Sequence, residues 1–107
     1  EALAAKLGPD WTVTDRSVGS QTYADMEDGT DLAGKESDPA SEDIDPLITG
    51  GTDLLIAWAG PNDVATGGDN LNAAAAYERV KTYVGNRQAA GWRVYVCTSP
   101  HTGAATQ

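Results

Sequence analysis

The residues of this chain whose types and spacing could do chemistry are Gly60-Pro61-Asn62-Asp63, directly after the apolar run TDLLIAWA of residues 52–59. An asparagine amide is a neutral hydrogen-bond donor. Such a donor, fixed at a strand end and facing a dry cleft, can stabilise charge that appears only in a transition state, by about 3 to 4 kcal/mol in a hydrolase. The same four residue types also form ordinary turns. Neighbouring residues must therefore decide between the two interpretations.

Nucleophiles and bases are less favourably placed. The serines Ser17, Ser20 and Ser99 lie in neither a Gly-Asp-Ser nor a Gly-x-Ser-x-Gly context, so we expect them to form hydrogen bonds only. His101 is the sole histidine and follows the last apolar run in the sequence TSPH, where we expect a solvated loop. The only cysteine, Cys97, sits inside that apolar run and is expected to be a buried, unreactive thiol.

Two apolar runs predict the strands that would position these residues. Thr52–Ala59, ended by a Gly-Pro pair, is typical of a strand buried on both faces of a parallel sheet. Residues 92–98, WRVYVCT, form a second run rich in β-branched residues and are closed by a Ser-Pro pair. Trp58 and Trp92 lie in these runs and are expected to pack in the core.

A helix is predicted between the two strands, from about Leu71 to Ala90. Asp69 or Asn70 can cap its start, and Gly91 stands at its end. The apolar residues that recur at helical spacing are Tyr77, Val80 and Val84. Strand, helix and strand therefore follow one another.

The first half of the chain has weaker patterns. Glu1–Leu7 is interpreted as the end of a helix, and a strand is expected to follow at the β-prone residues Trp11–Thr14. Val18–Thr22 is a small polar loop. Residues 27–45 are rich in acids, Gly and Pro, which predicts a solvated loop or insertion with a short helical turn near Ser41.

The alternation of apolar strands and a helix predicts the α/β class, as a three-layer α/β/α sandwich with a parallel sheet that is incomplete in this chain. Ligands of such folds bind beyond the carboxyl ends of the strands. This rule selects three segments as the candidate functional edge: Val18–Thr22, Gly60–Asp63 and Thr98–Thr102.

Charge and composition exclude several classes. The net charge of -9 over 107 residues disfavours nucleic acid as a partner, because phosphate backbones repel it. No apolar run reaches the about 20 residues that a membrane span needs. The acids of residues 27–45 do not have EF-hand spacing, so no metal site is predicted. A single cysteine permits no internal disulfide and leaves the compartment open.

At Gly60–Asp63 the chain resembles the SGNH hydrolase superfamily of GDSL esterases and lipases, whose third conserved block is a Gly-x-Asn-Asp turn after a hydrophobic strand. Val18–Thr22 resembles the second block, with Ser20 where the family usually has Gly. The helix that ends before Gly91 and the strand after it are similar to the next elements of the family. The resemblance implies that residues 1–107 are part of an SGNH domain with the flavodoxin-like fold.

In that family the Asn amide donates a hydrogen bond to the tetrahedral oxyanion, a role that the resemblance assigns to Asn62. It implies a bracing role for Asp63 and a second oxyanion donor at the backbone of Gly19 or Ser20. The Gly-Asp-Ser and Asp-x-x-His blocks of the family do not occur in this sequence, and we expect them upstream and downstream of it. A serine attacks an ester only when an oriented base removes its proton. We therefore expect essentially no turnover from these residues alone.

The implied function is that of a serine esterase or lipase acting on a small-molecule ester, an acyl lipid or an acetylated carbohydrate, without metal or organic cofactor. The alternative is a non-catalytic α/β module, flavodoxin-like or SGNH-like, that binds a small ligand or a carbohydrate. Without a first strand, the edge of a central strand is exposed. The isolated chain is therefore expected to self-associate.

Overall fold

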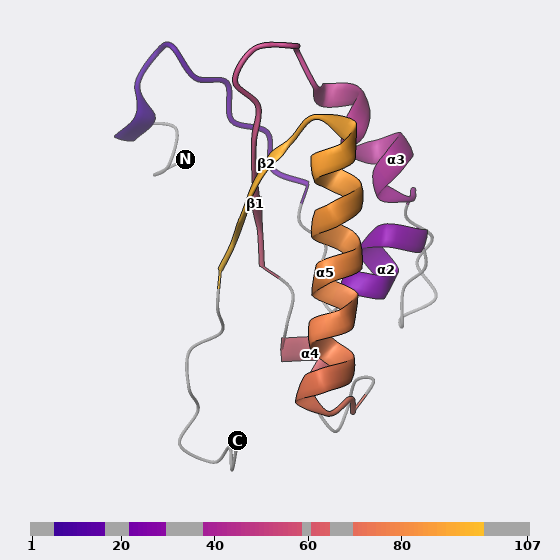
Figure 1. The fold of residues 1–107 in the computed structure, drawn as a ribbon. Coiled ribbons are helices and arrows are strands. Elements are labelled where there is room, and N and C mark those ends of the chain that lie inside the picture. The colour runs from indigo at the N-terminus through magenta and orange to yellow at the C-terminus, as the bar shows by residue number, and fades with distance from the viewer. Residues whose placement is uncertain (1–5, 17–21, 30–37, 59–60, 65–69, 98–107) are drawn as a thin grey trace.

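The computed structural model describes residues 6–16, 22–29, 38–58, 61–64 and 70–97. Within these residues the chain is α/β, with a two-stranded parallel sheet formed by β1 (Leu54–Ala57) and β2 (Arg93–Val96). Along the chain, β1 is followed by the short helix α4 (Pro61–Val64) and the long helix α5 (Ala73–Ala90) before β2 begins. Helix α5 runs beside the sheet (Figure 1). Both predicted strands and the predicted helix are therefore confirmed, each somewhat shorter than its sequence pattern.

The two faces of the sheet differ in burial. Side chains alternate between the faces of a strand, and in β1 the side chains of Leu55 and Ala57 belong to or contact the core. Ile56 points the other way and is 52% exposed, and its register partner Tyr95 in β2 is 57% exposed. Trp58, which follows β1, is 62% exposed. Helices therefore cover one face of the sheet, and no described residue buries the other.

Three burial predictions are wrong for this reason. The first strand was expected to be buried on both faces, but it is buried on one. Trp58 was expected in the core and is exposed, and Cys97 was expected to be buried and is exposed directly after β2. Trp92 precedes β2 and is half-buried. Hydrophobicity predicted the strands correctly, but it gives no information on which face a neighbouring element covers.

Helix α5 is defined by its caps. The side chain of Asn72 accepts a hydrogen bond from the backbone N–H of Ala75 at 2.9 Å. This makes Asn72 the N-cap, in place of the predicted Asp69 or Asn70, because the side chain of a cap residue satisfies an N–H that lacks an intrahelical partner. Gly91 ends the helix with φ +122°, a conformation that side-chain-bearing residues rarely adopt. The predicted C-terminal stop is confirmed.

The buried face of α5 differs from the predicted one. The buried side chains of the helix are Tyr83 and Arg87, with Val80 packed against the core beside them. Tyr77 is exposed, with the Lys81 ammonium 5.1 Å from the centre of its ring. An arginine in the buried face was not anticipated from a pattern that counts only apolar residues.

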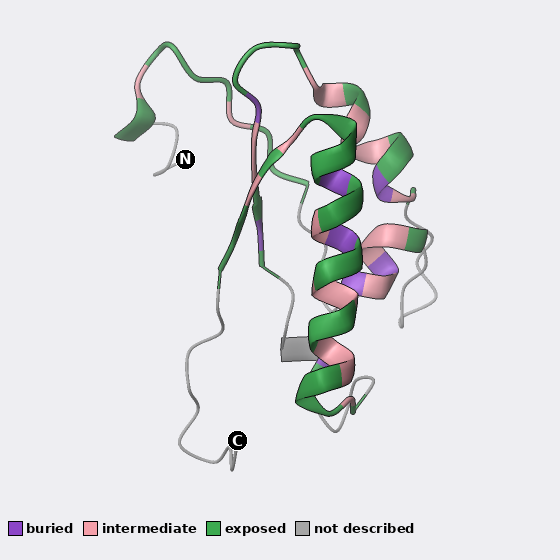
Figure 2. Cartoon of the chain, viewed as in Figure 1, coloured by how far each residue is buried: buried purple, intermediate pink, exposed green. Residues whose placement is uncertain are grey.

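Three short helices pack around α5. They are α2 (Tyr23–Asp28), α3 (Ala40–Asp43) and the 3-10 turn η1 (Asp45–Leu47). Figure 2 places the buried residues where α2, α3 and β1 face α5. The core is small, and its buried hydrophobic members are Tyr23, Ala40, Ala57 and Tyr83, with Met26, Ile44, Leu55 and Val80 packed against it.

A tight turn leads into β1. The carboxylate of Asp53 accepts hydrogen bonds from the hydroxyl of Thr49 at 2.8 Å and from the backbone N–H groups of Thr49 and Gly50. The Thr49 hydroxyl, with smaller help from these N–H groups, holds the pKa of Asp53 below its ordinary value. Gly50 has φ +88°, which suits glycine.

The remaining predictions for the first half have mixed outcomes. The β-prone residues 11–14 form no strand, because they pair with neither β1 nor β2. The helical turn near Ser41 is confirmed as α3. Residues 6 and 7 are helical, as predicted for the end of a helix. No helix among the described residues is long and apolar enough to span a membrane.

Candidate functional site

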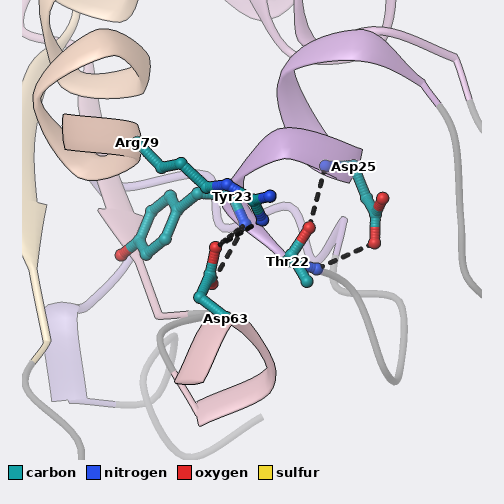
Figure 3. A network of polar contacts seen from close by, with 5 residues as sticks. All are labelled: Thr22, Tyr23, Asp25, Asp63 and Arg79. Atoms are coloured by element: carbon teal, nitrogen blue, oxygen red, sulfur yellow. Dashed lines mark hydrogen bonds and ion pairs between the residues drawn. The ribbon is translucent and has the colours of Figure 1, made fainter. Parts of the chain in front are cut away.

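The candidate site is centred on the carboxylate of Asp63 in α4, which is only 1% exposed. Its two oxygens accept the backbone N–H of Tyr23 at 3.3 and 3.2 Å, and Nη1 of Arg79 lies 3.2 Å from Oδ1 (Figure 3). Tyr23 opens α2 and Arg79 lies on α5. One carboxylate therefore joins three helices, and Tyr23 and Asp63 lie forty positions apart in the sequence.

The start of α2 is fixed by a second carboxylate. The Thr22 hydroxyl accepts a hydrogen bond from the N–H of Asp25 at 3.1 Å, and the Asp25 side chain accepts one from the N–H of Thr22 at 3.0 Å. This reciprocal arrangement is a capping box. The Asp63 carboxylate in addition accepts the N–H of Tyr23. Side chains therefore satisfy three N–H groups at the start of α2, where no intrahelical acceptor exists. Thr22 and Tyr23 are consequently buried and held in place.

The α4 turn is also held through its backbone. The carbonyl of Asp63 accepts the N–H of Leu71 at 2.9 Å, just before α5 begins. A helix of four residues is too short to be stable alone. Its position therefore depends on these contacts of Asp63 with α2, α5 and the residues that lead into α5.

The predicted site residues are only partly described. Asn62 lies in α4 next to Asp63, and its side chain lies outside the described part of the structure. Gly19, Ser20, His101 and the segment Thr98–Thr102 also lie outside the described residues.

The structure does bring the neighbours of two predicted segments together. Thr22 ends the loop Val18–Thr22, and Tyr23 directly after it contacts Asp63 of the turn Gly60–Asp63. The carboxyl end of β1 leads toward this turn, and the parallel β2 ends at the same edge of the sheet (Figure 1). Residues at or directly after two of the three predicted segments are therefore in contact.

Arg79 and Tyr23 were missed by the sequence analysis. Arg79, Tyr83 and Arg87 recur every four residues, so they share one side of α5. In this chain that side contacts the carboxylates of Asp63, Glu27 and Asp45, and the spacing of the two arginines is the signal that could have indicated it. The apolar periodicity of Tyr77, Val80 and Val84 indicates a neighbouring side, and of these three residues Val80 packs against the core.

A second buried cluster is centred on Arg87, whose side chain is 4% exposed. Its guanidinium lies 2.9 Å from an oxygen of Asp45 and 3.5 Å from an oxygen of Glu27. The indole N–H of Trp92 donates to the other oxygen of Asp45 at 3.0 Å. Burial, only partly offset by the nearby Arg87 charge, raises the pKa of Tyr83 to about 12.

A shallow groove of about 260 Å³ lies between α2 and α5. Its walls include Tyr23 and Arg79 of the Asp63 network, together with Glu27 and Tyr83 of the Arg87 cluster. Among the described residues, no group of three His, Cys, Asp or Glu side chains is arranged to hold a metal ion.

Comparison with known proteins assigns no family. The chain matches no family model, no curated protein and no solved structure. The indications of the site's chemistry come from its own residues. What they supply is a turn that carries an asparagine, anchored by its neighbouring aspartate to the start of a helix.

Proposed function

We propose that this chain carries the oxyanion-binding part of a serine esterase of the SGNH type. The observation that supports the proposal best is the contact of the Asp63 carboxylate with the N–H of Tyr23. It ties the turn that resembles the third block of the family to the residue directly after the loop that resembles the second block. An oxyanion hole built from two loops requires such a connection, because its donors must be held at fixed positions before charge develops.

In the proposed reaction the hydroxyl of a serine outside these residues loses its proton to a general base and attacks the ester carbonyl. The carbonyl oxygen becomes an oxyanion that accepts hydrogen bonds from the Asn62 amide and from the backbone N–H of Gly19 or Ser20. Collapse of this intermediate releases the alcohol, which takes the proton from the base, and leaves an acyl-serine. Water then attacks the acyl-serine as the base takes its proton. The serine leaves with that proton, and the acid is released. The substrate class is a carboxylic ester, an acyl lipid or an acetylated carbohydrate.

The finer fold proposed with this function is a three-layer α/β/α sandwich. Support comes from the uncovered face of the sheet, where Ile56, Tyr95 and Trp58 are exposed. Parallel sheets are normally covered by helices on both faces. The chain alone should therefore self-associate in analytical ultracentrifugation, whereas a monodisperse monomer with one cooperative unfolding transition would contradict the proposed layer.

The test of function uses the intact protein, meaning the product of the full open reading frame that encodes this chain. Hydrolysis of p-nitrophenyl acetate and butyrate is measured for wild type and Asn62→Ala. We expect a loss of about 100-fold or more in kcat for the variant, because one oxyanion donor is removed. Gln88→Ala, at an exposed amide side chain of α5, is the matched control and should retain activity. An inert wild type, or an Asn62→Ala variant as fast as wild type, would favour the non-catalytic binding module.

A further inference from the structure

The Asp63 carboxylate is anchored from one side by a residue to which the sequence assigned no role. Arg79 places a guanidinium nitrogen 3.2 Å from Oδ1 of Asp63, and its side chain is 28% exposed while that of Asp63 is 1% exposed. A buried carboxylate is costly without a compensating positive charge. Arg79 therefore supports the ionised form of Asp63 in the orientation that accepts the Tyr23 N–H.

Arg79 belongs to the longest described helix at the site. Helix α5 has 18 residues and is capped by Asn72 and Gly91. In contrast, α4 has four residues and needs outside contacts to keep its place. The ion pair between Arg79 and Asp63 holds the α4 turn against α5. Asn62 is the neighbour of Asp63 in that turn.

We infer that Arg79 is a positioning residue: through Asp63 it holds the α4 turn, and with it the Asn62 donor, in register with the start of α2. The inference rests on the proposed function. Transition-state stabilisation depends on donor placement to within about 0.5 Å, and a 1 Å error can cost about 100-fold in rate. Loss of the anchor should therefore lower kcat and leave KM nearly unchanged.

The experiment measures kcat and KM for p-nitrophenyl butyrate in the intact protein. Arg79→Met keeps the apolar stem and removes the charge; we expect kcat to fall about tenfold and KM to change less than about twofold. Arg79→Lys restores a charge with one compact donor group and should recover part of the loss. Lys81→Met is the matched control, because the Lys81–Glu78 ion pair lies exposed on the same helix, and it should retain wild-type kcat.

A double-mutant cycle separates positioning from general stabilisation. If Arg79 acts through the Asn62 donor, Arg79→Met should cost less than about threefold once Asn62→Ala is present, because residues that act as a unit are not additive. An equal loss in both backgrounds, or wild-type kcat in Arg79→Met, overturns the inference while the esterase function stands. An inert wild type instead overturns the proposed function, and the inference with it. If Arg79→Met unfolds, the same cycle is measured with Arg79→Lys. An equal loss of kcat with and without Asn62→Ala then overturns the inference.

Discussion

Two buried ion clusters contact the same side of α5, and they are built in opposite ways. At Asp63 the buried group is an anion, and its cation Arg79 is partly exposed. At Arg87 the buried group is the cation, and the carboxylates of Asp45 and Glu27 are partly exposed. Arg79 and Arg87 are separated by about 12 Å along the helix axis.

The difference lies in what each cluster holds. Asp63 accepts a backbone N–H and lies in the turn that carries Asn62, so it fixes backbone near the candidate site. Arg87 contacts side chains of α2 and η1, and its partner Asp45 also accepts from Trp92 beside β2. We therefore expect changes at Arg87 to act mainly on stability and changes at Asp63 to act on stability and on activity.

The largest expected stability effect comes from Arg87→Met. The substitution leaves Asp45 and Glu27 without their guanidinium partner in a partly buried setting, and removal of one member of a buried ion pair typically costs about 3 kcal/mol or more. Urea unfolding of the intact protein measures the free energy of unfolding. Arg93→Met, at an exposed arginine of β2, should change it by less than about 0.5 kcal/mol. Equal losses of stability for the two substitutions would contradict the conclusion that the buried ion pairs of Arg87 stabilise the fold.

Asp63→Asn should cost less, about 2 kcal/mol. An Asn side-chain oxygen can still accept the Tyr23 N–H, and Arg79 is partly exposed, so the main loss is the charge-assisted contact with Arg79. Activity in the proposed assay should fall as well, which is not expected for a variant of Arg87 that still folds. Asp28→Asn, at an exposed acid of α2, is the control. A larger loss of stability at Asp63 than at Arg87 would reverse the comparison.

Sequence patterns were sufficient for the local parts of this structure. The apolar runs predicted β1 and β2, and the Gly91 stop with the recurring apolar residues of the helix predicted α5, because each pattern depends only on neighbouring residues. The strand expected at residues 11–14 was wrong, since a strand needs a partner and β-propensity does not identify one.

The ion clusters could not be predicted in the same way. Arg79 and Arg87 look like solvated helix charges, and the acids in residues 27–45 looked like a solvated loop. Asp45 and Glu27 nevertheless pair with Arg87 across about forty and sixty positions of sequence. The turn Gly60–Asp63 was selected from its residue types. Its connection to Tyr23 depends on the tertiary arrangement, which one sequence does not reveal.

Thr22→Ala tests how the start of α2 is held next to the Asp63 contact. It should lower the free energy of unfolding by about 1 kcal/mol. The Thr22 hydroxyl caps α2 by accepting the Asp25 N–H, and loss of such a cap typically has this magnitude. Thr22→Ser keeps the hydroxyl and should restore most of the stability in urea unfolding. If Ser and Ala behave alike, burial of the Thr methyl group, and not the capping box, holds the start of α2.

Tyr83→Phe should have the smallest effect at neutral pH, about 0.5 kcal/mol or less, because the ring stays packed. Its signature is pH dependence. The pKa of Tyr83 is about 12 in the folded protein and 10.0 in its ordinary state, so between these values the unfolded chain binds fewer protons than the folded one. Stability from this group is complete below pH 10 and is lost as pH rises toward 12. Urea unfolding from pH 9 to 12 should therefore show a shallower loss for Tyr83→Phe than for the exposed control Tyr77→Phe. Identical slopes would mean that the Arg87 cluster does not bury the Tyr83 hydroxyl, and the contrast between a buried structural cluster and the Asp63 site would weaken accordingly.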